Sequence, residues 1–368
     1  MAVPRIQDAK LCFIGGGNMG SAIIGGLLAK GSTSKQNIIV SDPFEGTRKK
    51  VQDTHGVRVT TSNYEAAQDA DLLVLAVKPQ VAKGVCEDLA ASWRKSGEQK
   101  LPLIVSICAG IPLDALTKWF TVSDGKAPKV VRVMPNTPAL LGEGASGSFA
   151  GAGVSEDEKK LVTSLLEGFG KVSEWVNKEE LIDVVTALSG SGPAYFFLLV
   201  EHMVASATAL GMPRDQAERL AKQTCLGAGR MLVQSPESPG QLRVNVTSPK
   251  GTTEAALKSF QESNIEGIVD KAIKAAADRG EELASSSISI FLWKAKSISR
   301  FILSADRNMI RIRHERRNGI AELDPSKIIF VFQDSIENTG NATNLGDVLI
   351  HGAGELVRVL DTTLDCLP

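Results

Sequence analysis

The stretch LCFIGGGNMG, Leu11–Gly20, decides the fold of this 368-residue chain. Its first four residues form an apolar run typical of a buried strand, and a G-x-G-x-x-G pattern follows at once. After the glycines, apolar residues recur at helical spacing, among them Met19, Ile23 and Leu27. We therefore predict a strand, a tight turn and a helix, which together open a dinucleotide-binding domain.

Each glycine of this stretch has a physical reason. Gly15 suits the tight turn, Gly17 lets the backbone approach a pyrophosphate, and Gly20 permits close packing of helix on strand. The helix start adds unpaired N–H groups and the positive end of its dipole. The residues predicted to contact the cofactor here are Ile14, Gly15, Gly16, Gly17, Asn18, Met19 and Gly20.

Short β-branched runs alternate with helical patterns through the first half of the chain. Predicted strands are Leu11–Ile14, Ile38–Ser41, Arg58–Thr61, Leu72–Val77, Leu103–Ile107, Lys129–Val133, Ala145–Phe149 and Lys171–Val176. This alternation predicts an α/β, Rossmann-like doubly wound domain over residues 1–177, which binds its ligand beyond the carboxyl ends of the strands.

Residues at and near the end of the second strand bear on cofactor choice, and some of them favour NAD whereas others favour NADP. Asp42 is the kind of acid that accepts hydrogen bonds from the ribose of NAD and repels the extra phosphate of NADP. Ser41, Arg48, Lys49 and Asn63 are suited to hold that phosphate instead. We therefore predict NADPH as the cofactor, with NADH as the alternative.

Three further strand ends lie at the height of the ribose and nicotinamide. Ala76, Val77, Lys78 and Pro79 stand at the end of the fourth strand, and Cys108 and Ala109 follow the fifth. All six are predicted cofactor contacts. Cys108 is interpreted as a packing residue, because no base stands near it in sequence to activate a thiol. Met134–Pro138, with two prolines, is a rigid loop at the end of the sixth strand.

From Lys178 the pattern becomes helical. A helix from Glu180 is predicted to break at Ser189–Pro193 and to resume as Ala194–Leu210, and a second helix runs over about Arg214–Gln234. Helical patterns continue to Leu283, so residues 178–283 are predicted to form an all-helical domain. Ala194–Leu199 is apolar around most of its circumference, which fits burial within one subunit or against a second one.

The segment Asn245–Thr253 combines hydroxyls, a proline and a glycine directly before a helix. One interpretation is ordinary capping by a Thr or Ser side chain. The other is an anion site built from the first amides of the helix, with a substrate carboxylate as the candidate occupant. The segment alone leaves both open.

Residues 284–368 continue neither pattern and are rich in Lys and Arg up to Gly319. We predict a poorly ordered, atypical extension; an RNA-binding or membrane-surface tail is the weaker alternative. The whole chain has a formal net charge of −1, which gives no general attraction to nucleic acid or to an anionic membrane. Scattered cysteines and histidines predict no metal site, and the start of the chain, without a signal core, favours a cytoplasmic protein.

Taken together, these motifs resemble the pyrroline-5-carboxylate reductase family over about residues 9–283. The resemblance rests on Ile14–Gly20, Ala76–Pro79, Met134–Pro138, Leu188–Tyr195 and Val246–Thr253. Where the family usually has Pro-Gly-Gly, this chain has Pro249-Lys250-Gly251.

The resemblance implies reduction of 1-pyrroline-5-carboxylate to L-proline, the last step of proline biosynthesis, by hydride transfer to the imine carbon. By position it assigns Thr253 and Ser248 to the reaction, with the Thr253 hydroxyl near the ring nitrogen, and Asn245 to the cofactor. The implied substrate contacts are Ser189, Gly192, Pro193, Thr247, Gly251 and Thr252. It also implies a homo-oligomer built from dimers with interlocked helical domains.

Two alternatives remain at this stage. A β-hydroxyacid dehydrogenase shares the glycine pattern, but that family relies on a lysine after a glycine-rich break, and this chain has none until Lys222. A nicotinamide-binding module without catalysis is the second alternative, which the intact Ser248–Thr253 segment disfavours.

Overall fold

The computed structural model describes residues 3–97, 100–123 and 125–298, and beyond these only strands β9 to β13; side chains are described as far as Leu283. The chain forms two compact units, Met1–Ser285 and Ser286–Pro368, and each is described by itself. The boundary predicted between residues 177 and 178 falls inside the first unit and stays a prediction.

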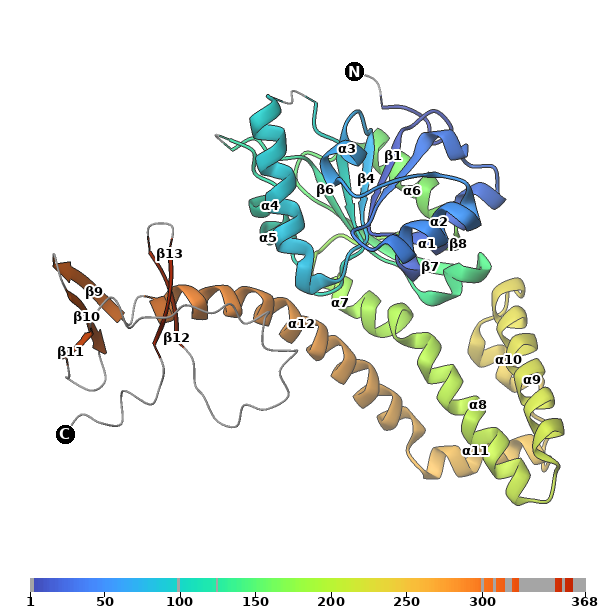
Figure 1. Ribbon diagram of the computed structural model, residues 1–368. Coiled ribbons are helices and arrows are strands. Elements are labelled where there is room, and N and C mark those ends of the chain that lie inside the picture. Colours follow the sequence, from blue (N-terminus) through green and yellow to red (C-terminus); the bar gives the residue numbers. More distant parts are fainter. Residues whose placement is uncertain are drawn as a thin grey trace. The chain divides into compact units, whose positions relative to one another are not determined.

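An eight-stranded sheet forms the core of the N-terminal part of the first unit (Figure 1). Its strands are β1 (Leu11–Ile14), β2 (Ile38–Ser41), β3 (Arg58–Thr60), β4 (Leu72–Leu75), β5 (Leu103–Ser106), β6 (Val130–Met134), β7 (Gly144–Ala150) and β8 (Gly170–Trp175). They lie in the order β3-β2-β1-β4-β5-β6-β7-β8, and only the β6–β7 pair is antiparallel. The order reverses beside β1, so the predicted doubly wound fold is confirmed.

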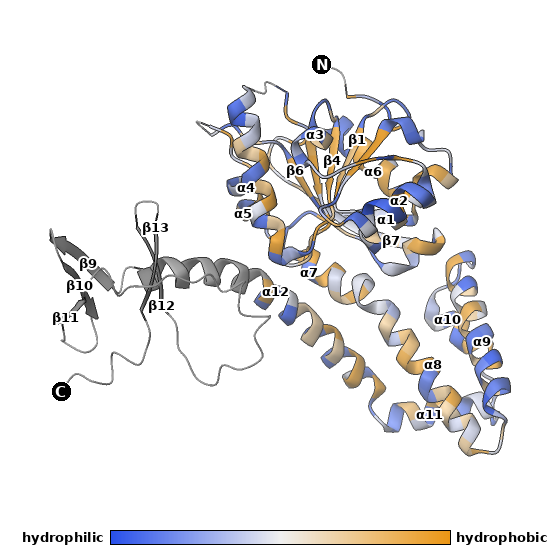
Figure 2. Ribbon diagram, viewed as in Figure 1, coloured by the Kyte–Doolittle hydropathy of each residue, from blue (hydrophilic) through white to orange (hydrophobic). Residues whose placement is uncertain are grey.

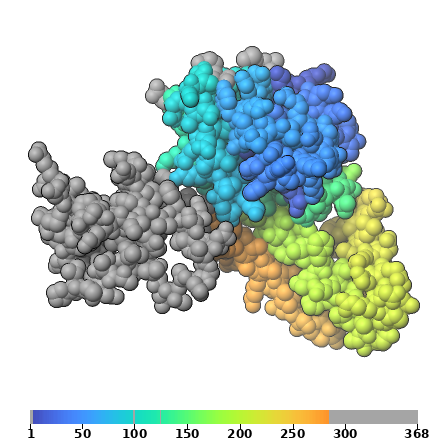
Figure 3. All heavy atoms as spheres, in the orientation of Figure 1, coloured from blue at the N-terminus to red at the C-terminus, as the bar shows by residue number. Residues whose placement is uncertain are grey.

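Helices cover both faces of this sheet, because each strand sends alternate side chains to opposite sides. Leu11 and Phe13 pack with α1, α2 and α6, whereas Cys12 and Ile14 pack with α3, α4 and α5. These helices are α1 (Asn18–Ala29), α2 (Glu45–His55), α3 (Asn63–Ala67), α4 (Pro79–Ser96), α5 (Leu113–Trp119) and α6 (Glu156–Glu167). Figure 3 shows, from one side, how closely the atoms of the blue to cyan residues pack together.

The rest of the first unit is helical. Its elements are α7 (Leu181–Val185), the π-helical turn η3 (Thr186–Gly190), α8 (Gly192–Ala209), α9 (Arg214–Gln234), α10 (Pro239–Asn245), α11 (Thr252–Glu262) and the part of α12 (Ile265–Ile298) up to Ser285. The predicted helix break at Ser189–Pro193 is confirmed in part. The chain widens there into one π turn, in which the Ser191 N–H donates to the Thr186 carbonyl at 2.8 Å, and after a bend at Ser191 it continues as α8 from Gly192.

Helix α8 leaves much of its apolar surface uncovered. Figure 2 colours most of it as hydrophobic, and the Phe197 side chain is 68% exposed. Other exposed apolar side chains on α8 are Phe196, Leu198, Leu199 and Met203. By length and composition alone, the continuous helical stretch Leu181–Ala209 could cross a membrane, but only 17% of its most apolar window is buried in the protein.

The second unit contains two small antiparallel sheets. Their strands are β9 (Phe301–Asp306), β10 (Met309–His314), β11 (Ile320–Leu323), β12 (Val348–Gly352) and β13 (Glu355–Val359). Helix α12 also extends past Leu283, where the predicted helical domain ends. Poor order of residues 284–368 stays a prediction, since most of that range lies outside the described residues.

Candidate active site

The turn after β1 is built on Gly15. Its φ of +102° is a conformation that side chains rarely allow, and its N–H donates to the Ser41 carbonyl at 2.8 Å. A Cβ atom placed on Gly15 would lie 2.6 Å from the Ala76 carbonyl oxygen. In turn, the Ala76 N–H donates to the Ile14 carbonyl at 2.8 Å. The first and fourth strands therefore meet at a turn that only glycine can form.

Helix α1 begins directly after this turn, with Gly17 as its N-cap and no side-chain cap. A Cβ on Gly17 would meet nothing within 4 Å, whereas one on Gly20 would lie 2.6 Å from the Gly15 carbonyl oxygen. The start of α1 is thus packed tightly against the glycine turn at Gly20, whereas the space beside Gly17 is open. This arrangement fits the pyrophosphate of a nicotinamide dinucleotide, with Asn18 and Met19 in the first turn.

The Asp42 carboxylate is buried and accepts hydrogen bonds from two backbone amides. It is 7% exposed; its Oδ2 accepts the Gly16 N–H at 3.0 Å and its Oδ1 accepts the Phe44 N–H at 2.9 Å. Interpreting Asp42 only as a ribose acceptor therefore missed a structural role. The acid ties the glycine turn to the loop after β2.

Beside Asp42 lie three of the four residues that were predicted to hold a phosphate. The Ser41 hydroxyl donates to the Asn63 Oδ1 at 2.7 Å. Arg48 donates through Nη1 to the carbonyls of Asp42, at 2.7 Å, and Pro43, at 2.8 Å. A hydroxyl, an amide and a guanidinium are thus gathered at the carboxyl end of β2.

The neighbouring strand ends complete this edge of the sheet. Lys78 is the N-cap of α4 and Pro79 is its first residue. The Cys108 thiol points inward and donates to the Val77 carbonyl, with 3.2 Å between sulfur and oxygen. Burial raises the pKa of this thiol to about 11, so Cys108 is protonated at neutral pH and is no nucleophile. Its predicted role as a packing residue agrees with these contacts, and Ala109 follows it at the same edge.

Asn136 joins this edge to the π turn, and it was absent from the predicted site residues. Its Nδ2 donates to the Ser189 carbonyl at 3.1 Å, and its Oδ1 accepts the Ala145 N–H at 2.9 Å. Widening the helix also frees the Ala187 carbonyl, which accepts the Tyr195 hydroxyl at 2.9 Å. Two prolines flanking Asn136 indicated a rigid loop, but no sequence pattern indicated which backbone groups its side chain would bond.

The segment Asn245–Thr253 connects α10 to α11 as a surface loop. Its predicted cofactor residue, Asn245, bonds locally to the side chains of Gln241 at 2.8 Å and Glu237 at 2.7 Å. The N-cap of α11 is Gly251, which has no side-chain cap, so the interpretation that a Thr or Ser caps this helix is wrong. The first amides, including those of Thr252 and Thr253, are left without partners from an earlier turn.

This loop borders a hollow of about 650 Å³ whose lining includes Thr247, Lys250, Gly251 and Glu254. Within the part of the chain described with side chains, no hydrogen bond joins the loop to the cofactor edge of the sheet. Ser189, Gly192 and Pro193 lie in or just after the π turn, which Asn136 does join to that edge.

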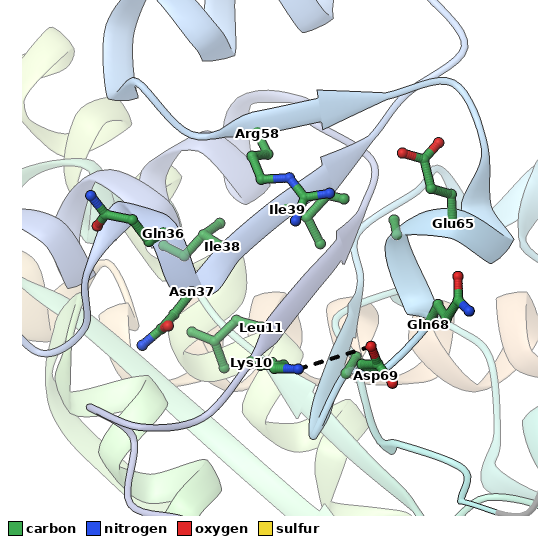
Figure 4. Close-up of a pocket in the computed structure, with 12 residues that line it drawn as sticks. Lys10, Leu11, Gln36, Asn37, Ile38, Ile39, Arg58, Glu65, Gln68 and Asp69 are labelled. Atoms are coloured by element: carbon green, nitrogen blue, oxygen red, sulfur yellow. Dashed lines mark ion pairs between the residues drawn. The ribbon is translucent and has the colours of Figure 1, made fainter.

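A second hollow, of about 230 Å³, lies at the opposite end of the strands (Figure 4). Lys10 and Leu11 at the start of β1 line it, together with Ile38 at the start of β2 and Arg58 at the start of β3. Ligands of doubly wound sheets bind beyond the carboxyl ends, so this hollow is separate from the cofactor site.

Comparison with known proteins identifies the family. A curated pyrroline-5-carboxylate reductase of Pseudomonas aeruginosa is 48% identical over 284 residues, covering 77% of this chain and 98% of that protein. The chain belongs to the pyrroline-5-carboxylate reductase family. A reductase of Arabidopsis thaliana is 37% identical over 280 residues, covering 76% of this chain and 97% of that one.

Other comparisons agree with this membership. The family pattern described as pyrroline-5-carboxylate reductase dimerisation matches residues 179–283, and one described as NADP oxidoreductase, coenzyme F420-dependent, matches residues 10–110. A solved reductase of Coxiella burnetii is 39% identical with a TM-score of 0.69, covering 75% of this chain and 98% of that chain. A Plasmodium falciparum reductase, solved with NADP bound, is 30% identical with a TM-score of 0.64, covering 76% and 99%.

Proposed function

We propose that this protein reduces 1-pyrroline-5-carboxylate to L-proline with NADPH, the final step of proline biosynthesis. The observation that carries the proposal is a pair of helix starts, α1 and α11, each with a glycine N-cap and no side-chain cap. One fits the pyrophosphate of the cofactor and the other fits the carboxylate of the substrate. Both lie in the region shared with reductases of this family.

The residues of the second loop bind and orient the imine. The amides of Thr252 and Thr253 point from the start of α11 and suit the two carboxylate oxygens, with Gly251 allowing close approach. The Ser248 and Thr253 hydroxyls provide further donors, and Thr247 lies on the rim. When bound, the reduced nicotinamide supplies the hydride that adds to C5 of the imine.

Proton supply is the task of the Thr253 hydroxyl in this proposal. A protonated imine is already electrophilic, so the protein needs mainly to position it and to keep a donor near the nitrogen. Thr253→Ala removes the hydroxyl, and Thr253→Ser is the control that keeps it. A fall in kcat for the alanine variant, with the serine variant near wild type, supports proton donation; a raised KM with unchanged kcat would limit Thr253 to substrate binding.

In this proposal Ser189, Gly192 and Pro193 contact the substrate on the side facing away from the Ser248–Thr253 loop. Ser189 lies in the π turn that Asn136 joins to the cofactor edge, and Gly192 and Pro193 open α8 just after it. Single π turns occur often at functional sites. The lysine on which the β-hydroxyacid dehydrogenase family relies has no counterpart at the start of α8. We therefore favour reduction of an imine over oxidation of an alcohol.

Cofactor choice follows from the environment of Asp42. Because both carboxylate oxygens accept backbone amides, we propose that Ser41, Asn63 and Arg48 dominate and that NADPH is preferred. The test compares kcat/KM for NADPH and NADH in wild type, Ser41→Ala and Arg48→Ala. We expect both variants to lose NADPH efficiency more than NADH efficiency. An equal loss for the two cofactors would contradict a phosphate contact.

We also propose a cytoplasmic homo-oligomer built from dimers, without nucleic-acid or membrane partners. Exposed phenylalanines and leucines on α8 form a surface that a second copy would cover, and the dimerisation pattern matches this part of the chain. Sedimentation of the purified protein tests the assembly. A monomer at micromolar concentration would contradict it.

The activity itself is tested with purified protein, 1-pyrroline-5-carboxylate and NADPH. We expect oxidation of NADPH that depends on the imine, and L-proline as the product. Folded protein that oxidises neither NADPH nor NADH in the presence of the imine would support the alternative of a binding module without catalysis.

A further inference from the structure

Lys250 occupies a backbone conformation that its side chain disfavours. Its φ of +59° lies in the left-handed region, where the Cβ of an L-residue crowds the following carbonyl oxygen. Glycine has no such conflict. The residue stands directly before the N-cap Gly251, so its conformation sets the direction in which the chain enters α11.

Glu254, in the first turn of α11, compensates for this conflict. Its Oε2 accepts the Lys250 N–H at 2.6 Å, and the Gly251 N–H donates to the Ser248 carbonyl at 3.0 Å. These two bonds pair the Lys250 and Gly251 amides, which directly precede α11. They leave the amides of Thr252 and Thr253 for an anion.

We infer that Glu254 is a positioning residue for substrate binding: its carboxylate holds Lys250 in the left-handed conformation and so fixes the amides that receive the substrate carboxylate. The inference rests on the proposed function, because it takes this loop as the substrate site. It concerns a residue that lines the same hollow as Lys250 and Gly251 without itself bonding the substrate.

Two effects of Glu254 on an anionic substrate have opposite signs, which makes the inference testable. Accepting the Lys250 amide favours binding by ordering the loop, whereas the negative charge disfavours binding by repulsion. Glu254→Gln keeps an acceptor oxygen and removes the charge, and Glu254→Ala removes both. A residue that acted through charge alone would therefore shift KM in the same direction in the two variants.

The experiment measures KM and kcat for 1-pyrroline-5-carboxylate at saturating NADPH in the full-length protein. We expect Glu254→Ala to raise KM about fivefold, with kcat within about twofold, because the left-handed conformation loses its support. Glu254→Gln should have a KM at or below that of wild type. Glu262→Ala, at the far end of α11 beside Lys258, removes an equal charge and should leave KM unchanged.

A double-mutant cycle tests the link to Lys250. In a Lys250→Gly background the conformation costs little, so adding Glu254→Ala should change KM by less than about twofold. The same fivefold rise in both backgrounds, or no rise in either, overturns the inference even if wild type is active. Wild type without imine-dependent turnover would instead refute the proposed function, so the two failures are distinguishable.

Discussion

The two helix starts, at Gly15–Gly20 and at Ser248–Thr253, have the same kind of N-cap, but the first helix packs into the core and the second is exposed. Each places a glycine at the N-cap and leaves the first amides without a side-chain cap. Helix α1 buries Ile23, Ile24 and Leu27 in the core, whereas α11 buries no residue within the protomer. The first anion site is thus held by core packing and by the Asp42 bond to the Gly16 amide, whereas the exposed one depends on local bonds such as that between Lys250 and Glu254.

Gly15→Ala is the largest perturbation of the packed loop. The new Cβ would stand 2.6 Å from the Ala76 carbonyl oxygen, at a φ of +102°. We expect a loss of about 3 kcal/mol or more in the free energy of unfolding, together with loss of NADPH binding. Chemical denaturation and cofactor titration measure the two effects.

Gly17→Ala is the matched control, since a Cβ there meets nothing within 4 Å. We expect nearly unchanged stability but weaker NADPH binding, because the added methyl group faces the expected pyrophosphate. Equal destabilisation by the two substitutions would show that the turn is not specified as described.

Asn136→Ala breaks the connection between the sheet edge and the π turn. It leaves the Ala145 N–H and the Ser189 carbonyl without their partner in a largely buried place. We expect a loss of about 2 kcal/mol in the free energy of unfolding, with lower kcat/KM. Asn37→Ala, which removes an exposed bond to the Gln7 carbonyl, is the control and should cost under about 1 kcal/mol. A cost no larger than that control would mean that the bridge contributes little.

Lys250→Gly should remove the unfavourable backbone conformation in the exposed loop Ser248–Thr253. Removing the side chain from a φ of +59° should raise the free energy of unfolding by about 0.5 to 1 kcal/mol, partly offset by the greater freedom of glycine in the unfolded chain. Thermal unfolding at one protein concentration measures the change. A decrease in stability would show that Lys250 makes contacts that outweigh its backbone conformation.

Asp183→Asn should give the smallest effect. Burial raises the pKa of Asp183 above its ordinary value of 3.8, and Glu281, Glu179 and Glu180 add to the rise while Arg132 opposes it. A raised pKa means that the fold favours the protonated acid, so the contribution of Asp183 is full below pH 3.8 and is lost as pH rises through the raised pKa. We expect the asparagine variant to gain about 1 °C in Tm at pH 7. A gain that did not shrink on acidification would contradict this account.

The sequence alone predicted the structure around Gly15–Gly20 better than that of the exposed loop Ser248–Thr253. Strands β1 and β2 were predicted with the bounds that the structure gives, because apolar runs and glycine spacing report burial directly. Family membership, fold class and the class of enzyme were also predicted and are confirmed by the relatives. Helix α9 likewise has its predicted bounds, Arg214–Gln234.

The remaining details depend on contacts distant in sequence or on single backbone angles. Ser189–Pro193 predicted a helix break because glycine and proline disfavour helices, and the structure has a π turn and a bend at Ser191 in its place. The bonds from Asn136 to the Ser189 carbonyl and from the Tyr195 hydroxyl to the Ala187 carbonyl could not be predicted from the pattern. Asp42 was interpreted as a ligand, since its bond to the Gly16 amide spans 26 residues. The left-handed conformation of Lys250 is likewise set by its bond to Glu254, which no local preference predicts.

The most direct test of the central claim compares two substrates that differ only in the carboxylate. If the start of α11 binds that group, kcat/KM with NADPH should be at least about a hundredfold higher for 1-pyrroline-5-carboxylate than for 1-pyrroline, which lacks it. Thr252→Pro, which removes one amide at a position where a helix tolerates proline, should narrow the ratio. Equal kcat/KM values for the two imines in the wild-type protein would contradict the account.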